Sequence, residues 1–386
     1  MVLVFRLIAF LLILLITSLL SLSLSVSKLS SAISKYQQSH ILYASNSNSN
    51  SNDEPLFSFG LIADIQYADC DDTMNFQQTK MRRYRQSLKI FRDASLYWQQ
   101  KKDEDNILFA VILGDILDGK CQSLNNRDKC YNDILDITKT VNDIDYHYCF
   151  GNHCHYSFSR KELHRNFVNP NNYGESKNSI GIPKYTTNSK LYYDFSPVPG
   201  WRFISLDSYD ISLIGASSAE NKIKAHDLLS ENNPNDLRIS GSWFDNLPFD
   251  KYRFVPYNGG VSTRQLRWLE DIIIKSKKNN EKVIVYAHQP IHAPDKPQSL
   301  IWNSEDIKRI ISKGNVVAFL AGHDHDGQFD IDNGITHIVP TAPIEVDDND
   351  KSYGILSVFP NKIKIKWTGK IPKKTRLPWT EELLFN

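Results

Sequence analysis

Five short apolar segments, each followed at once by polar residues of metal-binding type, constrain this chain most strongly. The segments read FSFGLIA, ILFAVIL, YHYCF, KVIVYA and VVAFLA, at residues 57–63, 107–113, 146–150, 282–287 and 316–321. Each has the length of a strand and is rich in β-branched or aromatic residues. Their nearly continuous hydrophobicity is typical of strands that are covered on both faces. The pattern therefore predicts buried strands in a layered domain.

Helical patterns lie between these segments. From Tyr84 to Trp98, the side chains expected on one face recur every three or four residues, which predicts an amphipathic helix. Ser262 and Gln265 have the spacing of a capping box, and Ser304 precedes two acidic residues that suit a helix N-terminus. Strands that alternate with helices predict an α/β fold with α+β layering. Later apolar runs predict further consecutive strands, open to antiparallel pairing, at residues 334–339, 354–359 and 362–367.

The N-terminal part of the chain differs in composition from the rest. After Arg6, the segment from Leu7 to Val26 carries no charge and no proline. It is long enough to cross a bilayer, and it also fits a secretory signal followed by small residues. Basic residues flank it on both sides, so the sequence leaves its orientation and its cleavage open. We expect entry into the secretory pathway or anchoring in a membrane, with a cytoplasm-facing orientation as the alternative.

The remaining boundaries also follow from composition. The repeat ASNSNSNSN at residues 44–52 has nothing to bury and predicts a flexible spacer. No later change in composition marks a second domain. The predicted parts are a signal or signal-anchor segment, a polar Ser/Asn-rich linker, one folded domain and a C-terminal tail, at residues 1–27, 28–54, 55–370 and 371–386.

Charge and cysteine content argue against several classes of protein. The 386 residues contain 45 Lys and Arg against 44 Asp and Glu, and this balance argues against a nucleic-acid partner. Five scattered cysteines do not make a disulfide scaffold. Cys121 and Cys130 flank one loop and are a candidate disulfide in an oxidising compartment, and the sequence leaves their state open.

The residues after the five apolar segments are of the types that bind metals. Ligands of open α/β sheets bind beyond the carboxyl ends of the strands, so we expect these side chains to meet at one edge. The motifs are Asp64-Ile65-Gln66, GDILDG with Asp115, Gly151-Asn152-His153, a lone His288, and GHDH with His323 and His325. Each motif alone is weak, since a lone histidine is as often structural, but the five together indicate a metal site.

Seven of these side chains suit a site for two divalent ions. The candidates for the first ion are Asp64, Gln66 and His325. The candidates for the second ion are Asn152, His288 and His323. Two ions held in this way clamp the attacking and departing oxygens of an in-line phosphoryl displacement.

Asp115 and His153 complete the predicted site. Asp115 would bridge the two ions, because a carboxylate can bind one ion with each oxygen. A water between the ions would lose its proton and act as the nucleophile. His153 is a candidate donor to a phosphate oxygen or to the leaving group. Histidines outside the motifs, such as His147, are expected on the surface or in local hydrogen bonds.

The motifs resemble the signature blocks of the calcineurin-like metallophosphoesterases, and more narrowly the manganese-dependent ADP-ribose/CDP-alcohol diphosphatases. The narrower likeness runs from about Phe59 to Glu345 and includes NFQQTKMRRYRQSL, YNGGVSTRQLRWL and AGHDHDGQF. The resemblance implies a β-sandwich of two mixed sheets flanked by helices, with a dimetal site at the carboxyl ends of strands. It also implies hydrolysis of ADP-ribose and of CDP-alcohols (CDP-choline, CDP-ethanolamine, CDP-glycerol) to a nucleoside monophosphate and a second phosphomonoester.

The resemblance also carries roles to single residues. The seven ligands and His153 match the family motifs by position. Gln66 stands where the wider superfamily usually has His, and its amide oxygen favours Mn²⁺ or Mg²⁺, so we expect two divalent ions, with Mn²⁺ preferred. Phe76 and Arg82, in the segment after Asp64, suit a base and a diphosphate. The alternatives for this pair are a core aromatic and a solvated charge.

Other functions stay open at the level of sequence. A cyclic nucleotide phosphodiesterase or a phosphomonoesterase would use the same kind of metal site. A scaffold that keeps the fold without metals should lack ligands, and none is missing here. We expect a small nucleotide as substrate, a membrane contact only through the N-terminal segment, and a monomer.

Overall fold

The computed structural model describes most of the chain from Glu54 onward. The described ranges are residues 54–141, 143–168, 190–239, 241–372 and 377–385. The predicted signal or anchor segment and nearly all of the predicted linker lie outside them. Within these ranges, no helix is both long enough and apolar enough to cross a bilayer.

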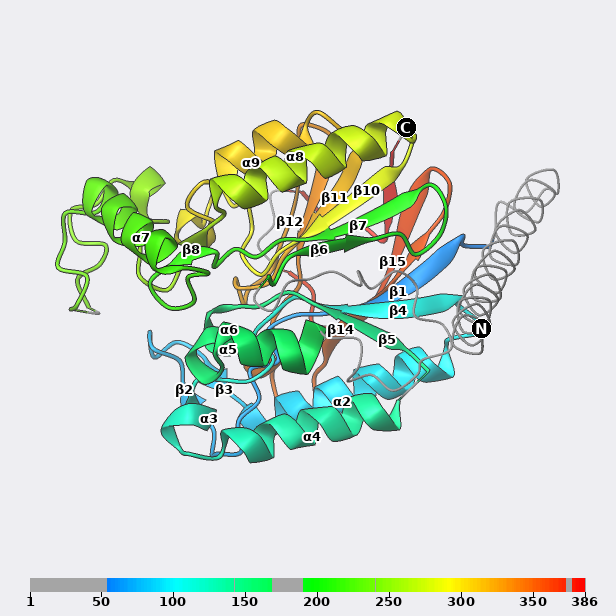
Figure 1. The fold of residues 1–386 in the computed structure, drawn as a ribbon. Helices are drawn as coiled ribbons and strands as arrows, with labels where there is room; N and C mark the ends of the chain where they lie inside the picture. Colours follow the sequence, from blue (N-terminus) through cyan, green and yellow to red (C-terminus); the bar gives the residue numbers. More distant parts are fainter. Residues whose placement is uncertain (1–53, 142, 169–189, 240, 373–376, 386) are drawn as a thin grey trace, which may run out of the picture. The chain divides into compact units, whose positions relative to one another are not determined.

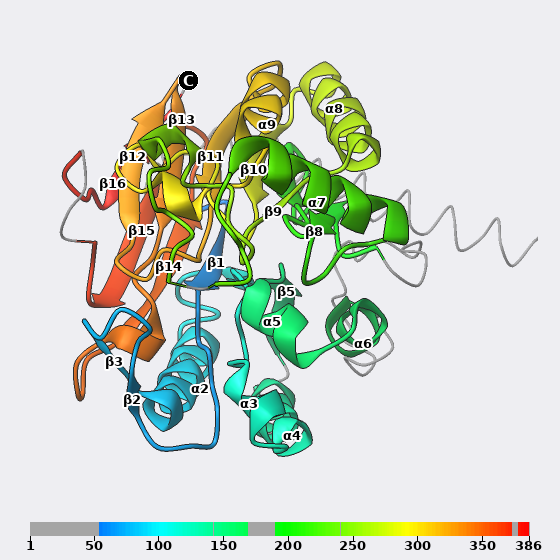
Figure 2. The same cartoon turned by 90° about the vertical axis from the view of Figure 1, so that its left-hand side faces the viewer.

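Two six-stranded sheets pack against each other as a β-sandwich (Figures 1 and 2). In order across the first sheet, the strands are β16 (Glu382–Leu384), β15 (Lys362–Gly369), β14 (Ser352–Val358), β1 (Phe57–Ile62), β4 (Ile107–Ile112) and β5 (Asp145–Tyr148). β1 is antiparallel to β14 and parallel to β4, so this sheet is mixed.

The second sheet is also mixed. In order, its strands are β12 (Gln328–Asp332), β13 (Ile335–Val339), β11 (Val316–Leu320), β10 (Lys282–Tyr286), β7 (Trp201–Ser205) and β6 (Tyr193–Phe195). The strands from β13 to β7 are parallel, and the two outer strands are antiparallel to their neighbours. All five strands predicted from the apolar segments are present, and the predicted sandwich of two mixed sheets is confirmed.

The folded body continues beyond Lys370, where the sequence predicted only a tail. β16 pairs with β15 and buries Leu383 in the sandwich core. The reason is that the three-residue strand is stabilised by its partner and not by its own sequence pattern.

Aromatic side chains fill the space between the sheets. Phe59 and Phe109 stack with ring centroids 5.4 Å apart, and Phe203 from the second sheet meets Phe109 edge-on at 5.1 Å. His147 in β5 also lies in this core and stacks on Phe195 with centroids 3.8 Å apart. Of the two expectations for His147, a place on the surface or in a local hydrogen bond, the surface is therefore wrong, because neighbouring aromatic rings cover its imidazole.

Helices cover the outer faces of the sandwich (Figure 1). The first sheet is covered by α2 (Tyr84–Gln100) and α4 (Arg127–Thr140), and the second by α8 (Thr263–Lys278) and α9 (Ser304–Ile311). Trp98 of α2 is fully buried against Gly60 of β1, so the predicted helix presents the predicted face. α9 begins at Ser304, as its acidic first turn predicts.

The predicted capping box at the start of α8 forms only in part. The Ser262 side chain accepts a hydrogen bond from the Gln265 backbone N–H, which caps the helix. The Gln265 side chain does not return this bond. It accepts from Asp207 N at 2.9 Å and donates to Asp207 O at 3.1 Å. Gln265 thus satisfies the buried backbone that follows β7, which a sequence spacing does not reveal.

Shorter elements lie around the edge where the strands end. They are the hairpin β2 (Thr73–Met74) and β3 (Met81–Arg82), the helices α3 (Lys120–Ser123), α5 (Asn152–Ser157), α6 (Arg160–Leu163) and α7 (Ala219–Asn232), the pair β8 (Ile211–Ser212) and β9 (Gly259–Gly260), and the single turns η1 (His164–Val168), η3 (Phe249–Lys251), η4 (Pro297–Ser299) and η5 (Pro343–Glu345).

Candidate metal centre

The predicted ligands occupy sharp turns directly after the central strands of both sheets. Asp64, Gln66, Asp115 and His323 have φ angles of 48°, 44°, 48° and 70°. This left-handed backbone is uncommon for residues other than glycine and is enriched at functional sites. Apart from Gln78, the other non-glycine residues with positive φ in the described ranges are asparagines. The backbone therefore sets these four positions apart.

Asp115 lies at the middle of the cluster. Its Oδ1 accepts hydrogen bonds from the backbone N–H groups of His153, at 2.9 Å, and Cys154, at 3.4 Å, in α5. Its Oδ2 lies 3.3 Å from His288 Nε2. A side chain at Gly151 would overlap both Asp115 and His288, so this position must be glycine for the two to meet. Asp115 is thus held from two sides at the sheet edge.

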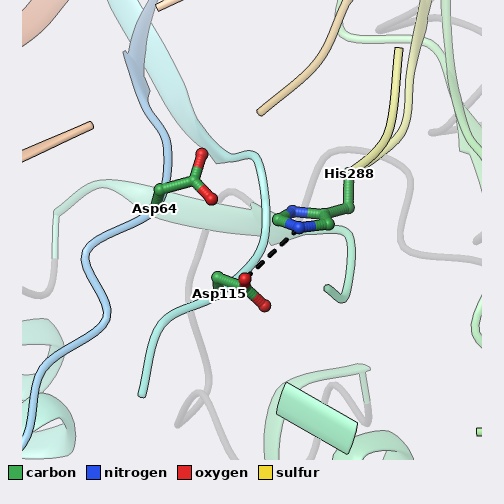
Figure 3. A group of neighbouring side chains, drawn as sticks. All are labelled: Asp64, Asp115 and His288. Atoms are coloured by element: carbon green, nitrogen blue, oxygen red, sulfur yellow. Dashed lines mark ion pairs between the residues drawn. The ribbon is translucent and has the colours of Figure 1, made fainter. Parts of the chain in front are cut away.

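Asp64, Asp115 and His288 lie close enough to share one ion (Figure 3). One potential ligand atom of each lies within 4.8 Å of the others. Asp64 Oδ1 and Gln66 Oε1 are buried and accept no hydrogen bond from the described residues. Such buried oxygens are costly without a partner. A divalent cation would satisfy both oxygens, so the residues fit a metal.

Two histidines are fixed so that one ring nitrogen points back into the protein. His288 Nδ1 donates to the backbone oxygen of Leu113 at 2.8 Å, and His325 Nδ1 donates to Glu345 Oε1 at 2.7 Å. These bonds place the protons on Nδ1 and leave Nε2 as the ligand atom of each ring. The two Nε2 atoms face Asp115 and Asp64, respectively.

His323 is fixed in the opposite sense. Its Nε2 lies 2.9 Å from Asn258 Oδ1, which also accepts from Gln289 Nε2 at 2.7 Å. Asn258 Nδ2 donates to the backbone oxygens of Arg253 and Gln298, so the orientation of this buried amide is determined. His323 Nε2 must therefore donate, and Nδ1 is left as the ligand atom.

The contacts among the predicted ligands lie on both sides of Asp115. Gln66 Nε2 and Asp64 Oδ1 lie 3.0 Å and 3.6 Å from His325 Nε2. On the other side of Asp115, His288 Nε2 lies 3.1 Å from His323 Nδ1. Asn152 faces the same cavity, and its Oδ1 accepts a hydrogen bond from Tyr209 at 3.3 Å. All seven predicted ligands thus meet at one edge of the sandwich.

The cluster attracts positive charge. Burial would raise the pKa of Asp115, but the neighbouring His288 and His153 hold it well below its usual range. Burial would lower the pKa of His288, but Asp115 raises it to about 9. Burial acts in the same way on His325, whose pKa the Glu345 carboxylate raises to about 10. Asp115 is therefore ionised and the two histidines hold their protons tightly, at the place where a divalent cation would bind.

A cavity of about 620 Å³ opens above the cluster. Its floor contains Asp115 and His323, and the β2–β3 hairpin lines one wall. Phe76, at the tip of the hairpin, lines the cavity and is 71% exposed, so it is not a core aromatic. Arg82 is half-buried in the same wall and lies 3.4 Å from Glu345. Both residues are therefore placed beside the cluster.

His153 lines the cavity next to the cluster. The backbone N–H of Gly119 donates to His153 Nδ1 at 3.1 Å. In the neutral ring, this bond leaves the proton on Nε2. Asp118 Oδ2 lies 3.1 Å from the same Nδ1, which places a negative charge beside the ring. His153 is thus equipped to donate a proton or a hydrogen bond.

Comparison with known proteins identifies the family. The family model for calcineurin-like phosphoesterases matches residues 57–327, which include all seven predicted ligands. The chain belongs to the calcineurin-like phosphoesterases. The resemblance seen in the sequence motifs is therefore confirmed.

Curated relatives of this phosphoesterase are similar over most of their length. A protein of Xenopus tropicalis is 35% identical over 84% of this chain and 94% of its own, and one of Arabidopsis thaliana is 35% identical over 82% and 96%. Both are named manganese-dependent ADP-ribose/CDP-alcohol diphosphatase. The crystal structure of a dimetal phosphatase from Danio rerio is 30% identical, covers 86% of this chain and 100% of its own, and superposes with a TM-score of 0.73.

Several residues that support the predicted ligands of this phosphoesterase were not themselves predicted. Glu345, Asn258 and Tyr209 act through hydrogen bonds to His325, His323 and Asn152. These supporting residues lie in loops and turns, and they do not follow predicted strands. Two residues had a signal: Asn258 lies in the YNGGVSTRQLRWL block that carries the resemblance, and the neighbouring Gln289 directly follows His288 in the sequence.

Proposed function

We propose that this phosphoesterase hydrolyses the diphosphate bond of ADP-ribose and of CDP-alcohols, and that it uses two divalent ions, preferably Mn²⁺. The curated relatives carry the name of this activity and of this metal. The observation that supports it best within the chain is the pair of ligand clusters that share Asp115 at the floor of a 620 Å³ cavity. A cavity of this volume suits a nucleotide-sized ligand.

The two ion positions would use the ligand sets predicted from the sequence. The first ion would bind Asp64, Gln66 and His325. The second would bind Asn152, His288 and His323, with Asp115 between the two. Bound ions of this kind polarise a phosphoryl group and activate water for in-line displacement.

The remaining chemistry depends on side chains around the cavity. His153 would donate from Nε2 to a phosphate oxygen or to the leaving group. Arg82 is placed to contact the second phosphate, for which a guanidinium offers paired donors. Phe76 would stack on the nucleobase from the exposed wall of the cavity. Arg82 already forms ion pairs with Glu345 and Asp118. On substrate binding, a phosphate would take the place of one of these two carboxylates as the partner of Arg82.

A substrate panel tests this proposal. The full chain, purified in detergent and loaded with Mn²⁺, is offered ADP-ribose, CDP-choline, a cyclic nucleotide and a simple phosphomonoester, and the products are identified by chromatography. We expect AMP from ADP-ribose and CMP from CDP-choline, and the release should stop on chelation. Turnover of only the cyclic nucleotide or only the monoester would contradict the proposed substrate class. No turnover by protein with bound Mn²⁺ would favour a scaffold role.

The compartment and the oligomeric state form a separate proposal. We infer from residues 1–27 that the chain enters the secretory pathway or is anchored in a membrane. We also propose that the folded part acts as a monomer. Synthesis in the presence of microsomes tests the first part, because protease protection should require residues 1–27. Light scattering of the full chain in detergent tests the second part, and a dimer mass would contradict it.

A further inference from the structure

Two thiols lie next to each other behind the metal centre. Cys121 is in α3 and Cys130 is at the start of α4, and both side chains are fully buried. No disulfide joins them, and each thiol shifts the pKa of the other, so they are close neighbours. Both also contact one loop, since the Cys121 thiol donates to Tyr67 O at 3.2 Å and Asp69 N donates to Cys130 Sγ at 3.3 Å. The two sulfurs therefore lie against the same short segment, residues 67–69.

The proposed reaction does not explain this pair. Neither cysteine lines the cavity above the ligands. Among the described residues, neither belongs to a group of side chains with the spacing of metal ligands. We propose that Cys121 and Cys130 form a disulfide under oxidising conditions, which joins α3 to α4 behind the metal centre.

The bond forms by thiol–disulfide exchange with a small disulfide such as glutathione disulfide. The Cys130 thiolate attacks one glutathione sulfur, the S–S bond breaks, and the departing glutathione thiolate takes up the proton that Cys130 released. Cys121 then loses its proton, attacks Cys130 Sγ and expels the second glutathione, which takes up that proton. Two protein thiols are oxidised, and one glutathione disulfide is reduced to two thiols.

The surroundings favour Cys130 as the attacking sulfur. The neighbouring Cys121 thiol lowers the pKa of the Cys130 thiol, and a larger thiolate fraction speeds the exchange. Residues 122–125, which follow Cys121, are exposed, and α3 has only four residues. Such a short surface helix can open without global unfolding, which gives the oxidant access to the buried pair.

The disulfide would hold two loops that carry predicted metal ligands. Cys121 N donates to Asp118 O at 3.1 Å, three residues beyond Asp115. Asp69, which donates to Cys130 Sγ, lies three residues beyond Gln66. A disulfide between these sulfurs would close a short loop of the chain, and a disulfide that closes so short a loop stabilises the folded state modestly. The oxidised chain should therefore be more stable than the reduced one.

Peptide mapping tests the pairing directly. The full chain is equilibrated with glutathione disulfide, alkylated without reduction and digested with trypsin. Cleavage after Lys120, Arg127 and Lys129 places the two cysteines in separate peptides, CQSLNNR and CYNDILDITK. We expect these peptides to be linked, with a mass two hydrogens below their sum, and to separate on reduction. Absence of the linked species, or linkage of either peptide to the one with Cys70, would overturn the proposal.

Thermal unfolding of variants tests the consequence. We expect oxidation to raise the midpoint of the wild type by about 4 °C. The half-buried Cys70 is the matched control, so Cys70→Ala should keep this gain. Cys121→Ala and Cys130→Ala should lose it. An equal gain in both of these variants would show that another bond causes it and would overturn the proposal, and if a variant fails to fold, the peptide map of the wild type decides.

Discussion

At the scale of single residues, the metal centre depends on backbone that few side chains tolerate. Asp64, Asp115 and His323 all have left-handed φ angles, and each follows a strand of the sandwich. Such conformations cost up to about 1–3 kcal/mol each, and they persist only where the surroundings enforce them. The conformation of Asp115 is enforced by two backbone N–H groups of α5, which donate to its side chain. A change of its charge should therefore act on metal binding more than on the fold.

Asp115→Asn tests this expectation. The amide cannot bridge two cations as a carboxylate does, so we expect kcat/KM for ADP-ribose to fall at least ~100-fold, with weaker Mn²⁺ binding. Initial rates and Mn²⁺ titration by electron paramagnetic resonance measure both. The matched control is Asp332→Asn, on β12, whose carboxylate pairs with Lys308 of α9; this variant should keep both values. Full activity of Asp115→Asn would remove the bridging role.

His153→Ala separates proton donation from metal binding. The residue contacts Asp115 only through its backbone N–H, so the ligand cluster should stay intact. Loss of a general acid lowers kcat by roughly 10²–10⁴-fold, and we expect a fall in this range with unchanged Mn²⁺ affinity. The control is His292→Ala, a histidine that pairs with Asp330 away from the cavity. If Mn²⁺ affinity fell together with kcat, the donor role would be wrong.

His147 makes stability depend on pH. Burial in the aromatic core lowers its pKa to about 3. The unfolded chain takes up a proton below pH ~6.5 while the folded chain does not, so stability is lost as the pH falls through this value. At pH 5.5 the loss from this residue is about 1.4 kcal/mol relative to neutral pH. In urea unfolding at pH 7.5 and 5.5, His147→Phe should show a pH-dependent loss smaller by this amount, and an unchanged loss would contradict the cause.

At the scale of elements, α2 and β1 touch without space between them. A Cβ on Gly60 would lie 2.5 Å from the ring of Trp98. Trp98 is fully buried and donates from Nε1 to Gly354 O at 3.0 Å, so it cannot move aside. The helix and the first sheet are therefore held at a distance that only glycine allows.

Gly60→Ala should destabilise the protein by about 1–3 kcal/mol, because overpacking forces a shift of the helix or the strand. Chemical unfolding measures this difference. Gly241→Ala is the control, since its Cβ would meet no atom within 4 Å. Equal stability of the two variants would show that the contact between α2 and β1 can relax.

The central strands could be predicted from sequence, whereas the edges of the sheets could not. β1 and β11 are continuous apolar runs because both faces are covered. β7 is interrupted by Arg202, whose charge is balanced by Glu281 and Asp194 only in the folded state. β6 and β16 have three residues each and need a neighbouring strand to form.

The candidate site likewise contains residues that could be predicted from sequence and residues that could not. The seven predicted ligands were recognisable because each follows a strand or belongs to a motif. The supporting roles of Glu345 and Asn258 were not, although Asn258 lies in a quoted block, since they orient His325 and His323 from turns that are distant in sequence. Their importance depends on the tertiary fold, which brings those turns to the sheet edge.

At the scale of the whole molecule, the predicted ligands come from both sheets. Asp64 and Asp115 follow strands of the first sheet, whereas His288 and His323 follow strands of the second. A bound ion would thus connect both halves of the sandwich. Since a ligand that binds only the folded state stabilises it, removal of metal should lower stability.

Chelation measures this coupling. At an ion concentration of 100 times the dissociation constant, binding at one site stabilises the fold by about 2.7 kcal/mol. We expect thermal unfolding with Mn²⁺ to shift to lower temperature on addition of a chelator. Asp115→Asn should show a much smaller shift. An equal shift in that variant would mean that Mn²⁺ stabilises the protein at another place.

The position of β1 has a consequence for synthesis. The first strand of the described chain lies in the middle of its sheet, with β14 on one side and β4 on the other. Its register pairs Phe57 with Val358, so the sheet cannot be completed until residue 358 has left the ribosome. Chains emerge at about 5–20 residues per second, so β1 waits many seconds for its partner. Until then β1 can pair with β4 alone, and the edge that it offers to β14 stays open.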